Sequence, residues 1–284
     1  MNHCLVFGAR GHLAKTRIIP ALEKRGCPYT SVSRGMSPRL VTEHTKDLPN
    51  LVAFMSIPTH NFEENVTPYM KEIDPLYILE KPHGHSLEDF EKLKKFIDDN
   101  NLKVVYNDHY LGKTALEEIE TFDFPSNMKT IKIVLKESAN INERITYFDS
   151  VGILGDMYQS HCVLIFAMIL TRITGKTRKE ILKELSVTKP RVLELNKSPL
   201  YLGTSPTRAL ITMEYEGIKL VAEMEKLTFD NKGICIDGVK RFDLNKGTCP
   251  YERVFDQIER GDTNFFLDED EVRYLWDHTS LIAC

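Results

Sequence analysis

The chain lacks the sequence features of several large classes of protein. None of its six cysteines forms a CxxC pair, so the paired spacing of a zinc ribbon or a dithiol motif is missing. It has no long run of basic residues and carries a formal net charge of -4, which disfavours a nucleic-acid or anionic-membrane partner. We therefore predict reduced, partly buried thiols, no metal site, and neither a nucleic-acid nor a membrane partner.

Long apolar segments are also missing. The apolar stretch at 4–7 is too short for a signal peptide and leads directly into a turn. The longest apolar run, 162–170, is too short to span a bilayer, so we expect a cytoplasmic protein. The composition is that of an ordinary globular protein, with 42% hydrophobic and 27% charged residues. The length of 284 residues is enough for two domains with buried cores.

Short apolar runs alternate with helical stretches in the first 107 residues. Ser86 is a suitable N-cap for the last of these helices, whose first turn carries Glu88 and Asp89. This order predicts a Rossmann-type α/β domain at 1–107, with ligands at the carboxyl ends of its parallel strands. The predicted strands are 4–7, 29–32, 51–56, 76–79 and 103–106, and the predicted helices are 12–25, 62–73 and 87–100.

The sequence pattern changes after residue 107. Alternating segments predict strands, and Glu216-Gly217 between two of them indicates a hairpin turn. The helix at 156–170 has an almost wholly apolar second half, so we expect it to be buried. We predict an α+β domain at 108–284, in which helices cover one face of an antiparallel sheet. Its predicted strands are 129–135, 209–215 and 218–225, with closing helices at 251–260 and 267–278.

A glycine-containing turn follows the first predicted strand. The segment Gly8-Ala9-Arg10-Gly11-His12-Leu13-Ala14 has the form GxxGxxA and opens a helix. Glycines let the backbone turn sharply, and the N–H groups at the helix start bind an anion such as pyrophosphate. Because the turn lies between a strand and a helix, it predicts a dinucleotide site. The predicted cofactor-binding residues here are Gly8, Arg10, Gly11, His12 and Leu13.

The end of the second strand indicates which dinucleotide binds. An acid there would hold the ribose 2′-hydroxyl of NAD, but the strand is followed by Ser33 and Arg34. A hydroxyl and a guanidinium suit a 2′-phosphate, so we predict NADP, with NAD as the alternative. Pro58, after the third strand, is predicted to form the wall beside the nicotinamide; the alternative is an ordinary loop proline.

Three later segments carry a family resemblance. They are EKPHG at 80–84, NDHYLGK at 107–113, and 147–161, which begins YFD and ends GDMYQSH. With the turn at 8–14 they resemble the glucose-6-phosphate dehydrogenases, whose motifs GxxGDLA, EKP-F-G, DHYLGK and YFDEFGIIRD occur in this order. PYERV at 250–254 resembles the family's AYERLI. The resemblance implies NADP-dependent oxidation of a phosphorylated hexose, glucose 6-phosphate at C1 to the lactone, and a homodimer.

The resemblance is interrupted and the chain is much shorter than the usual family enzyme. His12 replaces an aspartate of the first motif, and His83 replaces the phenylalanine after EKP. Ser160 precedes His161 where asparagine is usual, and 140–144 replaces a glycine-rich stretch. These departures bear on coenzyme preference and on the identity of the sugar more than on the type of reaction.

The resemblance also implies catalytic roles. Oxidising a sugar hydroxyl requires a base, and histidine is suited to this near neutral pH when another group orients it. By resemblance His161 is the base and Asp108 the carboxylate that orients it. Lys81, at the end of the fourth strand, would contact both the sugar oxygen and the nicotinamide amide.

Substrate-binding roles follow in the same way. A sugar phosphate requires cations and hydroxyl donors away from the reacting carbon, which also orient it. By resemblance His109 and Tyr110 hold the phosphate and Lys113 lies at the sugar or phosphate. Lys226 follows a strand as the family's later lysine does, although it could equally be a solvated strand-end lysine. Glu137 and Asp156 are expected by resemblance to accept hydrogen bonds from sugar hydroxyls. The alternative for Glu137 is a solvated acid at the end of a strand.

Two other functions remain open at this stage. The glucose-fructose oxidoreductase or inositol dehydrogenase type also has EKP and an aspartate a few residues before a histidine, as in Asp156 and His161, but it lacks DHYLGK. A variant of this alternative is an enzyme that has the glucose-6-phosphate dehydrogenase motifs but acts on another sugar phosphate or oxidises another carbon. The second alternative is a catalytically inactive relative that binds NADP or a sugar phosphate. Against it, the predicted base, its orienting acid and both main lysines are all present.

Overall fold

The protein is described by a computed structural model that covers residues 3–33 and 35–282. It divides into two compact units, one of Met1–Gly112 with Thr248–Glu269 and one of Lys113–Gly247 with Asp270–Cys284. The segment Thr248–Glu269 therefore belongs with the first unit, whereas the division into 1–107 and 108–284 places it with the second.

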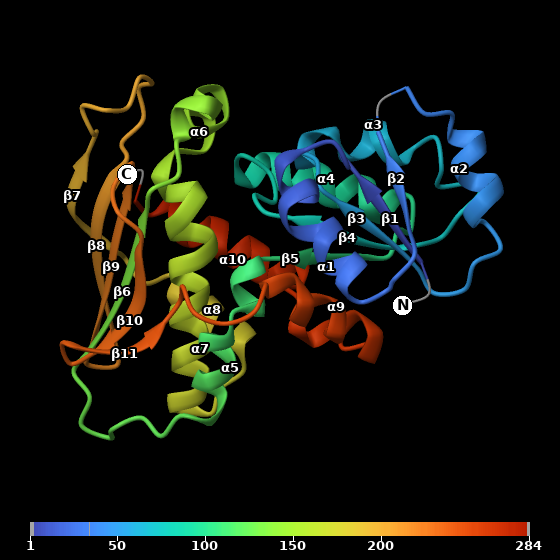
Figure 1. Ribbon diagram of the computed structural model, residues 1–284. Helices are drawn as coiled ribbons and strands as arrows, with labels where there is room; N and C mark the ends of the chain where they lie inside the picture. The colour runs from blue at the N-terminus through green and yellow to red at the C-terminus, as the bar shows by residue number, and fades with distance from the viewer. Residues whose placement is uncertain (1–2, 34, 283–284) are drawn as a thin grey trace. The chain divides into compact units, whose positions relative to one another are not determined.

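The first unit is built on a parallel five-stranded sheet in the order β2-β1-β3-β4-β5 (Figure 1). Its two central strands β3 and β4 are almost completely buried, as expected for a parallel sheet with helices on both faces. This confirms the predicted Rossmann-type unit. The strands are β1 (His3–Phe7), β2 (Tyr29–Val32), β3 (Leu51–Met55), β4 (Leu76–Glu80) and β5 (Val104–Asn107).

The helices of this unit follow the sequence signals, with two differences. In α4 the Ser86 hydroxyl accepts a hydrogen bond from the Asp89 N–H at 3.2 Å, as its capping role predicts. The predicted helix at 62–73 ends at Val66, because Pro68 lacks an N–H group, and α2 was not predicted. The elements are η1 (Ala14–Ile18), α1 (Ile19–Lys24), α2 (Pro38–Thr45), η2 (Thr59–Asn61), α3 (Phe62–Val66), α4 (Leu87–Asp99), η3 (His109–Gly112), α9 (Pro250–Arg260) and η6 (Thr263–Phe265).

Helix α9 returns to the first unit from the far end of the sequence. Tyr251, Val254 and Phe255 are buried in the same apolar core as the sheet. The rings of Tyr251 and Phe255 each lie 5.8 Å from the ring of Phe54 on β3, in edge-on contact. The PYERV segment is thus part of the first unit.

The second unit contains a six-stranded sheet in the order β11-β10-β6-β9-β8-β7. Its neighbours are antiparallel except β6 and β9, which run parallel, so the sheet is mixed where a purely antiparallel one was expected. The predicted hairpin is confirmed, because Glu216 and Gly217 both have positive φ, 48° and 78°. The strands are β6 (Thr130–Glu137), β7 (Arg191–Asn196), β8 (Arg208–Tyr215), β9 (Ile218–Lys226), β10 (Asn231–Ile236) and β11 (Val239–Asp243).

Helices line one face of this sheet, as predicted (Figure 1). Strands β6, β8 and β9 alternate between buried and less buried residues, and their buried side chains belong to the core. The predicted helix at 156–170 is present as η5 and α7, and α7 is almost wholly buried. The helices are α5 (Thr114–Thr121), η4 (Ile141–Arg144), α6 (Ile145–Ile153), η5 (Leu154–Cys162), α7 (Val163–Thr174), α8 (Arg178–Ser186) and α10 (Glu269–Ser280).

The helical run Ile141–Thr174 has a strongly apolar composition. By length and composition alone it could cross a membrane, unlike the short run considered in the sequence. However, 83% of its most apolar window is buried inside the fold, as in a core helix. It is therefore weak support for a membrane span.

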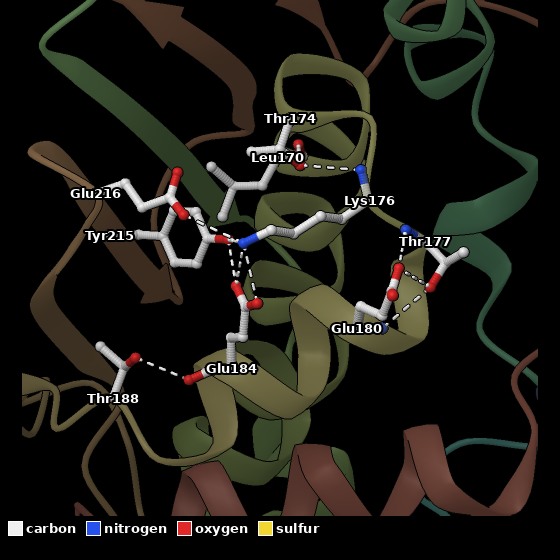
Figure 2. A network of polar contacts seen from close by, with 9 residues as sticks. All are labelled: Leu170, Thr174, Lys176, Thr177, Glu180, Glu184, Thr188, Tyr215 and Glu216. Atoms are coloured by element: carbon white, nitrogen blue, oxygen red, sulfur yellow. Dashed lines mark hydrogen bonds and ion pairs between the residues drawn. The ribbon is translucent and has the colours of Figure 1, made fainter.

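A polar network fastens the β8–β9 turn to the corner between α7 and α8 (Figure 2). The Lys176 ammonium donates to both carboxylate oxygens of Glu184 at 2.9 Å and to the Tyr215 hydroxyl at 3.1 Å. It also contacts Glu216 in the turn at 3.1 Å. These contacts join the helical layer to the hairpin.

The described cysteines are free thiols, in agreement with the prediction. Cys4, Cys27 and Cys162 are buried, and Cys235 and Cys249 are half-buried. Burial raises the pKa of the Cys4 thiol, which therefore stays protonated at neutral pH. Cys284 lies outside the described residues.

Candidate active site

The glycine turn lies at the switch point of the first sheet. The chain passes from β1 to β2 on one side and returns to β3 on the other, so the turn follows β1 where ligands bind in such sheets. Gly8 has φ 70°, and a Cβ there would lie 2.3 Å from the carbonyl oxygen of Ser56. Its N–H donates to the Val32 carbonyl at 3.0 Å. Glycine is therefore required at this position, and the turn rests on the ends of β2 and β3.

The rest of the turn leads into a helix whose first part is a π-helix. The Gly11 N–H donates to the Gly8 carbonyl at 2.8 Å, and the Lys15 N–H donates to the Gly11 carbonyl at 3.1 Å. Arg10 and His12, both exposed, lie between these bonds, and Leu13 precedes η1. The five predicted residues therefore lie in one short turn at a helix start, an arrangement suited to a pyrophosphate.

Ser33 and Arg34 are predicted to determine nucleotide choice, and Pro58 is predicted to form the wall beside the nicotinamide. Ser33 directly follows β2 and is half-buried. Arg34 lies outside the described residues. Pro58 follows β3 and is the N-cap of η2. The preference for NADP therefore stays a prediction.

A buried threonine joins the exits of β3 and β4. The Thr59 hydroxyl donates to the Pro82 carbonyl at 2.9 Å and accepts from the Gly84 N–H at 3.0 Å. Gly84 has φ 86°, and a Cβ there would lie 2.8 Å from the Phe90 nitrogen. These contacts hold the loop that carries Lys81. The sequence analysis did not single out Thr59, because it belongs to no recognised motif.

Two buried groups beside Lys81 are held neutral. The Asn107 amide donates to the Glu80 carboxyl at 2.5 Å, and burial raises the pKa of Glu80 to about 8 despite this bond. Burial lowers the pKa of His83 to about 4. The His83 ring packs edge-on against Tyr106 at 5.2 Å, so it fills the place of the family's phenylalanine as an aromatic ring. Glu80 and Asn107 belong to the motifs quoted above but were missed as site residues.

The intact DHYLGK motif forms a tight turn after β5. The Asp108 carboxylate accepts from the Tyr110 N–H at 2.9 Å. Burial raises the pKa of Asp108, against the attraction of His109 and Lys81. Four predicted residues of this unit therefore follow two adjacent strands, β4 and β5: Lys81, Asp108, His109 and Tyr110.

The glycine of this motif has a packing reason. A Cβ on Gly112 would lie 2.2 Å from the carbonyl oxygen of Pro250, at the start of α9. The next residue of α9, Tyr251, stacks on the His109 ring at 6.3 Å with an interplanar angle of 11°. The PYERV helix thus supports the DHYLG turn.

The second unit has a cluster of buried opposite charges. The parallel pairing of β6 and β9 places Glu137 opposite Lys226. The Lys226 ammonium, on a side chain 5% exposed, contacts both the Glu137 carboxylate and Asp156 Oδ2, the latter at 2.7 Å. Lys232 Nζ lies 2.6 Å from the other Glu137 oxygen. The structure therefore joins three predicted residues, and Lys232 was missed because no motif contains it.

The charges of this cluster keep one another ionised. Burial alone would raise the pKa of Glu137, but the ammonium groups of Lys226 and Lys232 outweigh it and hold this pKa well below its ordinary value. Burial would likewise lower the pKa of Lys226, but Asp156 and Glu137 raise it. Glu137 and Lys226 are therefore both charged at neutral pH.

Asp156 and the buried His161 lie on the same π-helix, η5. Residues five apart on an α-helix point about 140° away from each other, but about 4.4 residues per turn bring them to within about 50° on a π-helix. The π-helix therefore orients Asp156 and His161 to similar sides. π-Helical turns occur frequently at functional sites.

Two further motif residues support the fold of the second unit. The Lys113 ammonium donates to the Leu244 carbonyl at 2.9 Å. Asp149, in the YFD segment, accepts from the Ser205 N–H at 2.9 Å and the Tyr201 hydroxyl at 2.8 Å, and these bonds hold its pKa below its ordinary value. Asp149 therefore braces the loop between β7 and β8.

A Rossmann-type parallel unit is combined with a unit built on an open mixed sheet. The family described as glucose-6-phosphate dehydrogenase, C-terminal domain, matches residues 125–196. The matched residues lie within the second unit.

Proteins named glucose-6-phosphate 1-dehydrogenase are similar to parts of the chain. The chain is 31% identical over 137 residues to the bifunctional glucose-6-phosphate 1-dehydrogenase/6-phosphogluconolactonase of Plasmodium falciparum, covering 42% of the chain and 15% of that protein. It is 26% identical over 226 residues to the glucose-6-phosphate 1-dehydrogenase of a Helicobacter pylori strain, covering 71% of the chain and 51% of that protein. The chain thus spans at most about half the length of these relatives.

The fold likeness extends over the whole chain. A glucose-6-phosphate dehydrogenase solved with its substrate glucose-6-phosphate superposes with a TM-score of 0.70 at 18% identity, covering 99% of this chain and 91% of that one. Glucose-6-phosphate 1-dehydrogenase from Mycobacterium avium gives 0.74 at 16% identity, with coverages of 99% and 92%. The WlbA dehydrogenase from Thermus thermophilus gives 0.64 at 12% identity, with coverages of 100% and 95%.

Proposed function

We propose that the protein oxidises a phosphorylated hexose with NADP, converting glucose 6-phosphate at C1 to the lactone by hydride transfer. The family match at 125–196 and the similarity to glucose-6-phosphate 1-dehydrogenases support a sugar-phosphate dehydrogenase in general. The observation that carries the finer proposal is η5, which presents the buried His161 on a side similar to that of Asp156, itself bonded to Lys226.

The chain's own residues fit a dinucleotide. The turn at Gly8, Arg10, Gly11, His12 and Leu13 would hold the pyrophosphate, since a Cβ at Gly8 would collide with Ser56. Ser33 and Arg34 would hold the 2′-phosphate, and Pro58 would face the nicotinamide. When bound, the nicotinamide accepts the hydride that leaves the sugar carbon.

His161 is the proposed base that removes the proton of the sugar hydroxyl. An imidazole is suited to this at neutral pH, and Asp108 is proposed to set its orientation. Lys81 is proposed to contact the sugar oxygen and the nicotinamide amide. Its position depends on Thr59, which fixes the following Pro82 and Gly84 by hydrogen bonds.

The remaining residues would position the sugar phosphate. His109 and Tyr110 are proposed to bind the phosphate, whose binding energy orients the reacting carbon, and Lys113 is proposed to lie at the sugar or phosphate. Glu137 and Asp156 are proposed to accept hydrogen bonds from sugar hydroxyls. Lys226 contacts both of these carboxylates and helps to keep Glu137 ionised, so we assign it a positioning role.

The experiment is a substrate panel with the full chain, following absorbance of the reduced nicotinamide. Phosphorylated and free sugars are each offered with NADP and with NAD. The proposal requires turnover with glucose 6-phosphate that is faster with NADP than with NAD. Turnover only with free sugars would replace it by the glucose-fructose oxidoreductase or inositol dehydrogenase type. Turnover of a different sugar phosphate would overturn the substrate assignment, and NADP binding without any turnover would indicate an inactive relative.

A further inference from the structure

Tyr158 lies on η5 between Asp156 and His161, and the proposed function gives it no role. Its side chain and that of His278 on α10 are completely buried. The Tyr158 hydroxyl lies 2.9 Å from His278 Nε2, and His278 Nδ1 lies 2.7 Å from the Leu185 carbonyl oxygen near the end of α8. Two hydrogen bonds in series therefore join η5, α10 and α8 inside the second unit.

Chemistry fixes the direction of both hydrogen bonds. A carbonyl oxygen only accepts, so His278 Nδ1 carries a proton and donates it to Leu185. Burial lowers the pKa of His278, so the imidazole is neutral at pH 7 and its Nε2 is an acceptor. Burial raises the pKa of Tyr158, so this hydroxyl keeps its proton and donates it to Nε2. Each donor in this buried series thus meets an acceptor.

Helix α10 is also held against α8 by a separate contact. Arg178 Nε and Nη2 donate to the Glu271 carboxylate at 2.7 and 2.9 Å, and the Glu271 side chain is 4% exposed. Arg178 precedes Leu185 by seven residues, and Glu271 precedes His278 by seven, so the two helices are joined at points about 10 Å apart along each axis. The docking of α10 therefore has support that does not involve Tyr158.

The π-helix η5, in contrast, follows a break in the helical backbone. Gly152, at φ 60° and ψ 179°, interrupts the helix just before η5, so α6 does not set the rotation of η5 about its axis. Two side chains of η5 contact different neighbours: Asp156 Oδ2 lies 2.7 Å from Lys226 Nζ on β9, and Tyr158 bonds to α10. These two residues are about 160° apart on a π-helix of about 4.4 residues per turn. The helix η5 is thus held from nearly opposite sides.

We propose that Tyr158 and His278 are positioning residues that set the rotation of η5 and thereby the direction of the His161 imidazole. This inference rests on the proposed function, in which His161 is the base and Asp156 bonds to the sugar. The contacts of Asp156 would then change when the sugar binds, whereas the buried Tyr158–His278 bond would stay in place. A fixed orientation matters because a misplacement of about 1 Å can cost about 10²-fold in rate.

The first test is hydrogen exchange of the full chain in the wild type and in Tyr158→Phe, which removes one oxygen and keeps the ring. Peptides within 154–162 should exchange roughly 10-fold faster, because one buried hydrogen bond no longer opposes their opening. Peptides of α10 should exchange as in the wild type, because Arg178 still holds Glu271. The matched control is Tyr274→Phe, which removes the hydroxyl of a half-buried tyrosine on α10 and should leave both regions unchanged.

A second measurement follows His161 directly. In protein with ring-13C-labelled histidine, the His161 signal is assigned by its loss in His161→Asn. This signal should shift or broaden in Tyr158→Phe and stay in place in Tyr274→Phe. If Tyr158→Phe does not fold, the double variant Tyr158→Phe/His278→Leu replaces it in both measurements, because replacing both partners leaves no unpaired imidazole nitrogen. The Leu185 carbonyl would still accept from the Thr188 N–H at 2.9 Å.

Three results would overturn the proposal: unchanged exchange within 154–162, an equal rise in α10, or an unmoved His161 signal. Neither measurement requires turnover, so a failure of the proposed function would be recognised separately, in the substrate panel. In the active enzyme, Tyr158→Phe should lower kcat about 10-fold, because the base is misdirected, and leave KM for NADP unchanged, because the glycine turn is untouched. An unchanged kcat would contradict the positioning role.

Discussion

The charge states of titratable groups inside the two units are opposite, neutral in the first unit and ionised in the second. In the first unit Glu80 and His83 are buried, and burial shifts both pKa values toward the neutral form, to about 8 and about 4. In the second unit Glu137 and Lys226 are equally enclosed, but each is kept charged by its partners. The same desolvation acts in both places, and opposite charges within contact distance reverse its outcome.

This difference fits the proposed function. Under that proposal, the neutral Glu80 and His83 lie in the unit whose turn would bind the charged nucleotide. The ionised Glu137 lies in the unit that would offer hydrogen-bond acceptors to sugar hydroxyls. The difference also means that the two units should respond differently to substitution and to pH.

The largest expected effect is from Lys226→Met. Removing this ammonium leaves Glu137 and Asp156 buried without it, which should reduce the free energy of unfolding by about 3–5 kcal/mol. Urea unfolding at pH 7 measures the loss. Lys219→Met, exposed on the same strand, should stay near the wild-type value.

The same variant should change the response to acid. Because the pKa of Glu137 is lowered by folding, its contribution to stability is present above its ordinary value of 4.5 and lost as the pH falls below it. Wild-type stability should therefore fall steeply below about pH 4.5, and Lys226→Met should fall less. Equal acid profiles would show that the ion cluster does not keep Glu137 ionised.

The next largest effect is expected from His161→Asn. This variant tests the proposal that the catalytic base belongs to the second unit and the nucleotide site to the first. His161→Asn should lower turnover at least ~10²-fold, because the base is removed. NADPH binding, followed by fluorescence, should survive since the glycine turn is untouched. His44→Asn is the matched surface control. An unchanged rate would refute the base assignment.

A smaller effect is expected from Glu80→Gln, which tests whether the buried Glu80 carboxyl is held neutral. Glu80→Gln keeps an acceptor for the Asn107 amide but cannot ionise. A raised folded pKa means that stability is lost as the pH rises toward about 8, so the variant should gain roughly 3 °C or more in melting temperature at pH 8–9. Little gain is expected at pH 5. Glu72→Gln, exposed in the same unit, should show no such trend.

The smallest effect concerns coenzyme choice. Arg34→Ala should weaken NADP binding by about tenfold and NAD binding much less, because one charge-assisted contact to the 2′-phosphate is lost. Arg39→Ala, which removes an exposed arginine paired with Glu43, is the control. Equal weakening of both nucleotides would mean that Arg34 does not recognise the 2′-phosphate.

Much of the fold was predictable because its signals are local. Short apolar runs located the strands of the first unit, and alternation located β6, β8 and β9 of the second, although β7, β10 and β11 were not predicted. Ser86 marked the start of α4, and Glu216-Gly217 marked the hairpin. The glycine at position 8 was predictable for the same reason, since a turn between strand and helix requires it. The end of α3 at Val66 could also have been predicted from Pro68, but the apolar pattern continues past this proline and indicated a longer helix.

Other features depend on segments far apart in the sequence. No local signal shows that β6 pairs in parallel with β9, or that Lys232 reaches Glu137. The buried position of Glu80 and the support that Tyr251 gives His109 are equally invisible, because they arise from α9 and β5 meeting in one unit. These contacts explain why the site contains residues that the motifs alone did not mark.

The sequence by itself determined many of the elements, the glycine turn after β1 and the resemblance carried by its motifs, since these depend on residues close together along the chain. Only the tertiary structure decided that Glu137, Asp156 and Lys226 form one cluster. The physical reason is that pairing partners and charge states depend on which distant segments become neighbours and how much water they exclude.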